Sequence, residues 1–214
     1  IAKTQSGIDV DIAKLALNNL GYKVSVTFAP LERGRRLVLD KQADLFLPTF
    51  YEPDKTGVFL SDAFIQYRPT FFTLKKKHAK LNHLSDIKNQ RVATFQGATG
   101  YFGEVFVDMT KRNDYREIHD MSKLPELLIA DRIDVVVLDY YIFYFYLRSY
   151  SQQREINRDL TTAINAFALI PPVSAYVGFH DKNLRDQFNQ SLKIVLAQQQ
   201  DQRIIEHYIG SLTH

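Results

Sequence analysis

The chain has 214 residues, of which 45% are hydrophobic and 24% charged, and its formal charge is +3; this is the composition of an ordinary globular protein that is large enough to bury a core. Lys and Arg are scattered along the sequence, apart from Lys75 to Lys77, which we interpret as a solvated strand end; this excludes the dense basic surface of a nucleic-acid-binding protein. No cysteine is available for a disulfide or a thiolate metal site, the histidines lack metal-ligand spacing, and the most apolar run, Ile133 to Leu147, contains two aspartates and predicts no membrane helix.

The first part of the chain alternates between patterns typical of helix and strand. Its periodic segments predict helix, strand, helix and strand in that order, at residues 7–21, 23–28, 30–40 and 43–47. The links between them are short, which favours an α/β sheet of mainly parallel strands. Arg33 lies near the start of the second helix and is the arginine of that helix that we expect to reach a ligand.

The same alternation resumes after a long aromatic and β-prone stretch at 63–75, which could extend from one sheet to another. The later segments with helix or strand patterns are 92–95, 102–109, 116–119, 121–130, 133–138, 140–150, 164–170, 173–179, 183–198 and 202–209. The sequence therefore predicts two α/β units joined by one extended segment, and a second extended segment near residue 175 returns the chain to the first unit.

A glycine turn follows the predicted strand at 92–95. Gly97 and Gly100 allow close approach of another group to the backbone, and Thr99 adds a hydroxyl. A helix that starts directly after the turn leaves backbone N–H groups unpaired at the positive end of its dipole. The turn is either a plain strand-to-helix connection or a site for a carboxylate or another small anion.

Thr49, residues 97–99 and Asp139 all come at the carboxyl ends of predicted strands, where ligands of α/β sheets bind. This coincidence favours a binding site. Asp139 either caps the helix that follows it or faces a ligand cation, and its position alone does not decide between the two. The aromatic run Tyr140 to Tyr146 indicates packing rather than a binding cage. No phosphate-loop, nucleophile-elbow, zinc-protease or dinucleotide motif occurs, so no cofactor is predicted.

Nine short motifs follow one another along nearly the whole chain: Gly7-Ile-Asp-Val-Asp-Ile-Ala-Lys14, Gln42-Ala-Asp-Leu45, Pro53-Asp-Lys55, Leu60-Ser-Asp-Ala-Phe64, Leu84-Ser-Asp-Ile-Lys88, Gly97-Ala-Thr99, Ile133-Asp-Val-Val-Val-Leu-Asp139, Asn183-Leu-Arg-Asp-Gln-Phe-Asn189 and Ile204-Ile-Glu-His-Tyr-Ile-Gly210. Their order and spacing resemble those of the bacterial extracellular solute-binding proteins of family 3. These are the type-2 periplasmic binding proteins that include the polar amino-acid receptors of ABC transporters.

The resemblance implies an α/β, two-lobed periplasmic binding protein type 2 fold with two crossover strands and the ligand in the interlobe cleft. It assigns residues 1–74 and 175–214 to lobe 1 and residues 75–174 to lobe 2. The hinges are then expected near 73–76 and 174–178.

The resemblance also implies roles for individual residues. Gly97, Ala98 and Thr99 would hold the carboxylate of the ligand, and Asp139 would bind its α-ammonium group. Thr49 would be a hydrogen-bonding residue of lobe 1.

Three features depart from the family pattern. Lys55 stands where amino-acid binders usually carry Arg, and it supplies a charge but no bidentate fork. The serines usual after the predicted strand at 43–47 are replaced by Pro48 and Thr49. The sequence begins beyond the point where the first strand of the family and its ligand-contacting loop lie, so contacts from that segment are not assigned.

These observations predict a binding protein without enzymatic activity. We expect a monomer in the periplasm, in its mature form because no signal peptide occurs, which captures an amino acid or organic acid for the membrane permease of an ABC transporter. The alternative is the ligand-sensing ectodomain of a membrane receptor such as a sensor kinase, although the chain ends at His214 with no membrane helix following. A third hypothesis is a dehydratase-like enzyme, whose general acid would be Glu104 or Asp139; both residues have simpler roles on a helix face or at a ligand.

Overall fold

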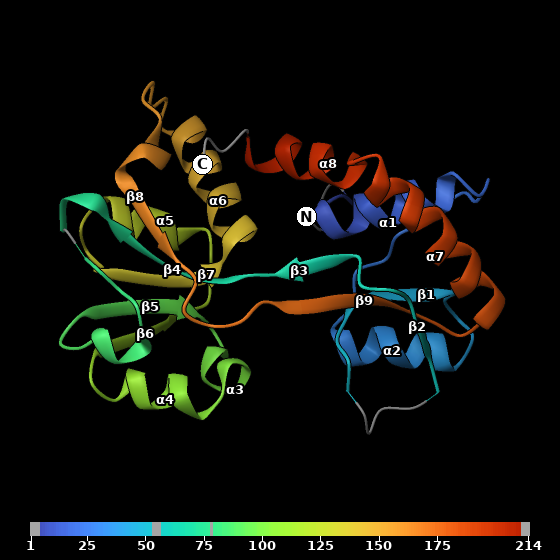
Figure 1. Ribbon diagram of the computed structural model, residues 1–214, viewed down its shortest axis with the longest axis horizontal. Helices are drawn as coiled ribbons and strands as arrows, with labels where there is room; N and C mark the ends of the chain where they lie inside the picture. The colour runs from blue at the N-terminus through green and yellow to red at the C-terminus, as the bar shows by residue number, and fades with distance from the viewer. Residues whose placement is uncertain (1–4, 53–56, 78, 211–214) are drawn as a thin grey trace. The chain divides into compact units, whose positions relative to one another are not determined.

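The computed structural model describes residues 5–52, 57–77 and 79–210, and the chain divides into two compact units (Figure 1). Of the described residues, unit 1 contains those between 5 and 67 and between 173 and 210, and unit 2 contains those between 68 and 172. Each unit has its own sheet and its own helices.

Unit 1 is built around a strand from the C-terminal part of the chain. Its elements are α1 (Ile8–Asn18), α2 (Leu31–Leu39), β1 (Leu45–Thr49), β2 (Phe59–Leu60), β3 (Ile65–Tyr67), β9 (Val173–Phe179), α7 (Lys182–Ala197) and α8 (Gln200–Ile209). Strand β9 pairs antiparallel with β1, β2 and β3. Within this unit, α1, α7 and α8 lie on one side of the strands and α2 on the other (Figure 1).

The first helix shows how the sequence produces this layer. Its buried residues, Ile12, Ala13, Ala16 and Leu17, recur at helical spacing and form one face, which packs with β9 and α7 in the core of unit 1. The hydroxyl of Ser191 on α7 donates to the carbonyl of Ala16 at 2.7 Å and ties the two helices together.

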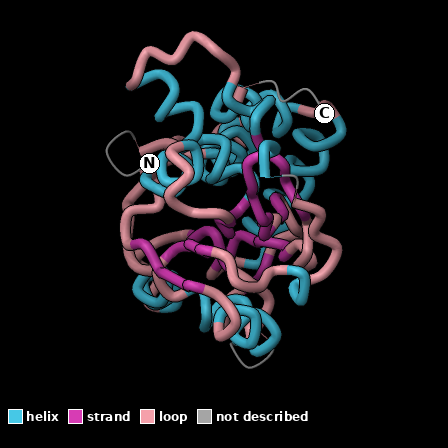
Figure 2. Tube along the Cα trace, turned by 90° about the vertical axis from the view of Figure 1, so that its left-hand side faces the viewer, coloured by secondary structure: helices cyan, strands magenta, loops and turns pink. Residues whose placement is uncertain are grey.

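Unit 2 contains a five-stranded mixed sheet. Its elements are β4 (Pro69–Leu74), β5 (Arg91–Phe95), α3 (Ala98–Phe102), α4 (Glu104–Thr110), β6 (Asp114–Ile118), α5 (Lys123–Ile129), β7 (Val135–Asp139), α6 (Tyr140–Gln153) and β8 (Ile164–Phe167), with short 3-10 helices at Lys75–Lys77, Leu84–Asp86 and Leu160–Ala163. The strand order is β6-β5-β7-β4-β8. In Figure 1 the helices α5 and α6 lie on one side of this sheet and α3 and α4 on the other, and Figure 2 shows strands between layers of helix from the side.

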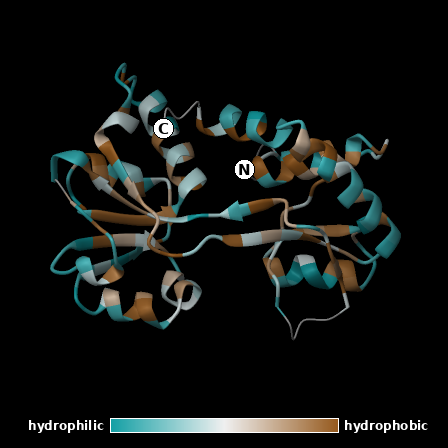
Figure 3. Ribbon diagram, in the orientation of Figure 1, coloured by the Kyte–Doolittle hydropathy of each residue, from teal (hydrophilic) through white to brown (hydrophobic). Residues whose placement is uncertain are grey.

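The central strands of unit 2 are covered on both faces. Every residue of β4 and of β7 is buried, and β7 is largely hydrophobic in Figure 3. Phe72 on β4 stacks on Phe143 of α6 with 3.7 Å between ring centroids. The continuous apolar run at 133–138 predicted a buried strand, and β7 is buried on both faces of the sheet.

Three expectations about the fold were wrong in detail. Residues 23–28 alternate as predicted but form no strand, because no described strand pairs with them. The strands are not mainly parallel: the described pairs of unit 1 are all antiparallel, and the sheet of unit 2 is mixed, with β5 parallel to β6 and β7 and β4 antiparallel to β7 and β8. The helix expected at 102–109 is interrupted at Gly103, whose φ of 77° lies outside the helical region.

The division between the units also differs from the expected lobe boundaries. Residues 68–74 were assigned to lobe 1, but β4 pairs with β7 and β8 and belongs to unit 2. The chain crosses between units after Tyr67 and after Pro172. The segment at 73–76, expected as a hinge, therefore lies inside unit 2.

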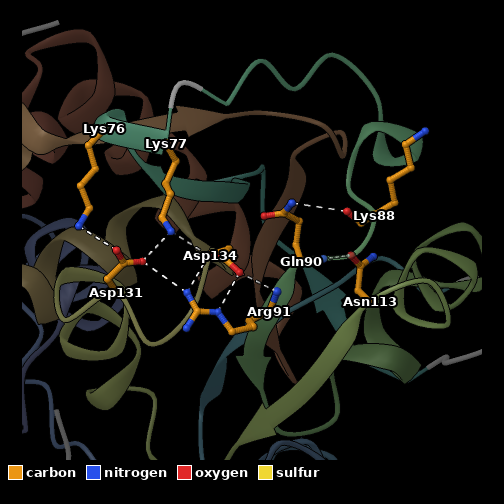
Figure 4. Close-up of polar contacts among 8 residues, drawn as sticks. All are labelled: Lys76, Lys77, Lys88, Gln90, Arg91, Asn113, Asp131 and Asp134. Carbon is orange, nitrogen blue, oxygen red and sulfur yellow. Dashed lines mark hydrogen bonds and ion pairs between the residues drawn. The ribbon is translucent and has the colours of Figure 1, made fainter.

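An ion-pair cluster joins the starts of β5 and β7 in unit 2 (Figure 4). Arg91 donates from its backbone N–H, Nε and Nη2 to the carboxylate of Asp134 at 2.8–2.9 Å. Lys77 reaches Asp131 at 2.8 Å and Asp134 at 3.3 Å, and Lys76 reaches Asp131 at 2.8 Å. Lys76 and Lys77 are thus partly solvated, as expected, but they are also paired, which the sequence did not indicate.

These contacts lower the pKa values of both carboxylates. Lys76 and then Lys77 hold the pKa of Asp131 at about 2, and Arg91 is the main cause of the lowered pKa of Asp134. A lowered folded-state pKa contributes stability above the unfolded value of roughly 3.9 and loses it as the pH falls through the folded value. Both carboxylates therefore contribute fully at neutral pH; the contribution of Asp131 is lost between about pH 4 and pH 2, and that of Asp134 persists to lower pH because its pKa is lowered further.

We expect Asp134→Asn to lower the free energy of unfolding by about 2 kcal/mol at pH 7, because a neutral amide replaces a carboxylate with three charge-assisted or backbone hydrogen bonds. Urea denaturation measures the effect. The matched control is Asp114→Asn, whose ion pair with Arg116 is exposed on both sides and is worth at most about 0.5 kcal/mol. Equal effects of the two substitutions would show that the cluster adds nothing beyond a surface ion pair.

Candidate functional site

The glycine turn at the end of β5 holds a carboxylate that belongs to the chain itself. The backbone N–H of Gly97 donates to Oε2 of Glu117 at 2.9 Å. The backbone N–H and the hydroxyl of Thr99 donate to Oε1 at 3.3 and 3.2 Å, and the hydroxyl of Tyr115 donates to the same oxygen at 2.9 Å. Gly97 has a φ of 91°, a conformation that strains other residues, and this brings the two N–H groups to one point.

The charges in this cluster are consistent with an ionised Glu117. Its pKa is lowered, chiefly by the hydrogen bond from the Gly97 backbone and then also by Tyr115 and Thr99. The pKa of Tyr115 is raised, first by burial and then by the adjacent carboxylate. At neutral pH the turn therefore receives a negatively charged group, the ligand type that the sequence predicted for it.

Asp139, the last residue of β7, caps the helix that follows. Its Oδ1 accepts the backbone N–H groups of Tyr141 and Ile142 at 2.9 and 3.1 Å, in the first turn of α6. Its Oδ2 accepts the backbone N–H of Arg68 at 2.7 Å, just before β4. The residue is only 9% exposed. Of the two roles that the sequence left open for Asp139, the cap is thus present in the structure.

The glycine turn and Asp139 lie at the same edge of the unit 2 sheet. The turn follows the end of β5, and Asp139 is the last residue of β7. These two strands are parallel neighbours, with Thr94 opposite Val137. The pKa of Tyr101 in α3 is raised by burial and, in addition, by the charge of Asp139. The carboxyl ends of two adjacent parallel strands therefore meet there, as in ligand sites of other α/β sheets.

Aromatic rings and one arginine surround Asp139. The guanidinium of Arg68 lies over the ring of Tyr140 at 5.1 Å and near that of Tyr141 at 5.9 Å, and it donates to the hydroxyl of Tyr141 at 3.5 Å. Tyr101 packs edge-on against Phe95 at 5.9 Å. Tyr140 and Tyr141, the first residues of the aromatic run, therefore make cation–π contacts with Arg68 in addition to packing.

Sequence reasoning missed Glu117 and Arg68. Glu117 reaches the turn because β6 pairs in parallel with β5, and no local sequence pattern indicates this pairing partner. Arg68 is placed by the pairing of Pro69 with Asp139. Both contacts depend on strand order, which short sequence motifs do not encode.

Two of the remaining predicted site residues, Thr49 and Arg33, belong to unit 1. Thr49 is the last residue of β1, 7% exposed and opposite Tyr176 of β9. Arg33 is exposed in the first turn of α2. Lys55 lies outside the described residues.

The part of the chain that the structure describes contains neither a cluster for a metal ion nor a helix that could span a membrane. No group of three or more His, Asp or Glu side chains in that part of the chain could hold a metal ion. None of its helices is long and apolar enough to cross a membrane.

Several solved structures are similar to this one over almost the whole chain. An ancestral cationic amino acid solute-binding protein has a TM-score of 0.77 and 18% identity, covering 95% of this chain and 86% of the other. A polar amino acid ABC uptake transporter substrate-binding protein from Streptococcus thermophilus has a TM-score of 0.71 and 16% identity, covering 96% and 78%. The chain has the fold of these solute-binding proteins.

The same fold occurs in the GluR0 ligand-binding core solved with L-glutamate, with a TM-score of 0.67, 14% identity and coverage of 96% and 90%. No protein-family model and no curated protein matches the sequence. The two-lobed periplasmic binding protein fold expected from the short motifs is thereby confirmed, at identities that show the fold alone. These neighbours are binding proteins.

Proposed function

We propose that this chain is a solute-binding protein that captures a small polar solute carrying a carboxylate, an amino acid or a similar zwitterion. The observation that carries the proposal is the Gly97 turn, where two backbone N–H groups and the hydroxyl of Thr99 converge on one carboxylate. Solved proteins with the same fold are named for cationic amino acids, for polar amino acids and for a complex with L-glutamate, which supports this class of ligand.

Each candidate residue has a proposed role that fits its chemistry. Gly97, Ala98 and Thr99 bind the ligand carboxylate through backbone N–H groups and a hydroxyl. Asp139 binds the α-ammonium group, because a buried carboxylate attracts a cation strongly in a low-dielectric site. Further polar contacts to the ligand come from Thr49, Lys55 and Arg33.

The proposed role is capture without catalysis. The two carboxylic acids considered for catalysis are Glu104, which is exposed in the first turn of α4, and Asp139, whose oxygens accept three backbone N–H groups. We propose that Glu104 is a helix-face residue and that Asp139 is a cap and ligand contact, and that neither acts as a general acid. We propose that a monomer in the periplasm delivers the solute to the membrane permease of an ABC transporter; the structural neighbour from Streptococcus thermophilus, a substrate-binding protein of such a transporter, supports this proposal.

A thermal-shift screen of the purified chain against the twenty amino acids, polyamines and organic acids tests this function. A ligand at about 100 times its dissociation constant stabilises the folded state by roughly 2.7 kcal/mol. For a protein of this size we expect a rise in the melting temperature of several degrees with at least one amino acid.

The distribution of hits separates the possible outcomes. A hit with an amino acid that is lost in Thr99→Ala supports the proposed orientation of the carboxylate. Hits restricted to polyamines would contradict the carboxylate site, because these ligands have no group for the Gly97 turn. No hit from any class would contradict the proposed function itself.

A further inference from the structure

We propose that Glu117 is an internal competitor for the ligand carboxylate at the Gly97 turn, and that it thereby weakens the binding of every carboxylate ligand by the same factor. This inference rests on the proposed function, because it concerns the same turn. It assigns a role in setting the affinity to a residue on β6 that neither the short motifs nor the fold single out.

The first step of the argument is that Glu117 occupies the donors that a ligand carboxylate would need. Its two oxygens take the N–H of Gly97 and both the N–H and the hydroxyl of Thr99, at distances of 2.9 to 3.3 Å. Each of these hydrogens has one good position for an acceptor, so Glu117 and a second carboxylate cannot both be bound there in full.

The second step is that Glu117 can leave the turn. Its side chain is exposed, and it projects from β6, the outermost strand of the unit 2 sheet among the described residues. The contacts to Thr99 are longer than ordinary charge-assisted hydrogen bonds. Exposed polar contacts of this kind contribute little net stability, because water replaces them when they open.

The third step is the consequence for affinity. When only a fraction of the molecules has a free turn, the apparent dissociation constant is the intrinsic constant divided by that fraction. If Glu117 fills the turn in roughly nine molecules of ten, a carboxylate binds about tenfold more weakly than it would to an empty turn. The factor is the same for every carboxylate that needs these donors. A simple anion with no other contact therefore becomes a weak ligand, whereas a ligand with further contacts, such as an ammonium group, keeps useful affinity.

The experiment compares wild-type protein with Glu117→Ala, using sodium acetate as the probe. Backbone amide NMR shifts of Gly97 and Thr99 report acetate in the turn. We expect saturable shifts in Glu117→Ala with a dissociation constant at least fivefold lower than in the wild type. The control is Glu104→Ala, which removes the same charge from the first turn of α4 and leaves Glu117 in place. The acetate affinity of this variant should match that of the wild type. The same comparison with the amino acid found by the screen should show at least fivefold tighter binding in Glu117→Ala.

The outcomes separate this inference from the proposed function. Equal acetate affinity in the wild type and in Glu117→Ala would overturn the inference, even if an amino acid binds both. Weaker amino-acid binding in Glu117→Ala would also overturn it, because Glu117 would then be a ligand contact. Tighter acetate binding in Glu117→Ala, without any amino-acid ligand for either protein, would support the competition and contradict the proposed function.

Discussion

Replacement of Asp139 by alanine is expected to lower the free energy of unfolding by about 3 kcal/mol and to weaken ligand binding by roughly 2 kcal/mol or more. The loss of stability arises because the backbone N–H groups of Arg68, Tyr141 and Ile142 lose their acceptor at a site that is 9% exposed. The loss of affinity arises because the ligand ammonium group loses its counter-charge. Urea denaturation and calorimetric titration measure the two effects separately.

The matched control for this substitution is Asp181→Ala. Asp181 caps α7 in unit 1 by accepting the N–H of Leu184 at 2.7 Å, and it has no proposed contact with the ligand. Its loss should cost about 1 kcal/mol of stability, as for an ordinary helix cap, and leave the affinity unchanged. If Asp139→Ala lowers the free energy of unfolding no more than this control, the contact of Asp139 with the start of β4 adds no stability to the cap of α6. If the variant binds the ligand with unchanged affinity, Asp139 is a helix cap and not a ligand contact.

Phe72→Ala is expected to have the largest effect on folding, a loss of about 4 kcal/mol. Phe72 is fully buried in β4, stacks on Phe143 with an interplanar angle of 9° and meets Tyr144 edge-on at 5.7 Å. Its removal leaves a cavity between strand and helix, in addition to the lost transfer free energy and ring contacts.

The size of this effect distinguishes a packed strand from a superficial one. Phe59→Ala provides the comparison, since Phe59 is 41% exposed in the short strand β2, and it should cost less than about 1.5 kcal/mol. Urea denaturation of both variants is the measurement. A loss at Phe72 as small as at Phe59 would contradict the packing of α6 against β4.

The parts of the fold that local periodicity specifies were predicted well. The apolar run at 133–138 became the buried strand β7, and the helical patterns at 7–21 and 183–198 became α1 and α7 within a few residues. The chain passes between the units inside the β-prone stretch at 63–75, after Tyr67, and next to the extended segment near residue 175, after Pro172. In these segments the burial pattern itself carries the information.

Strand pairing could not be predicted in the same way. The directions of β4 and β9 relative to their neighbours were missed because antiparallel pairing there depends on contacts far apart in sequence. Residues 23–28 have the alternation of a strand, and no described partner completes the ladder. By contrast, the break at Gly103 did carry a local signal, since glycine is the residue that most readily adopts its positive φ.

The candidate site shows the same division between local and distant information. The affinity of the Gly97 turn for a carboxylate follows from local backbone geometry, and a carboxylate is found there. That the carboxylate belongs to Glu117 follows only from the parallel pairing of β5 with β6. Asp139 was placed correctly at the end of β7, but the third N–H that it accepts comes from Arg68, 71 residues earlier in the chain.

Calorimetric titration of the amino acid selected by the screen, beside its two single-group analogues, tests the central claim most directly. The analogues are the corresponding amine without the carboxylate and the corresponding acid without the amino group. The account predicts one ligand bound per chain and a loss of at least roughly 2 kcal/mol of binding free energy for each analogue, because each leaves the Gly97 turn or Asp139 without its partner. Undiminished binding of either analogue would contradict a zwitterion site, and the absence of saturable heat with the intact amino acid would contradict solute capture by this chain.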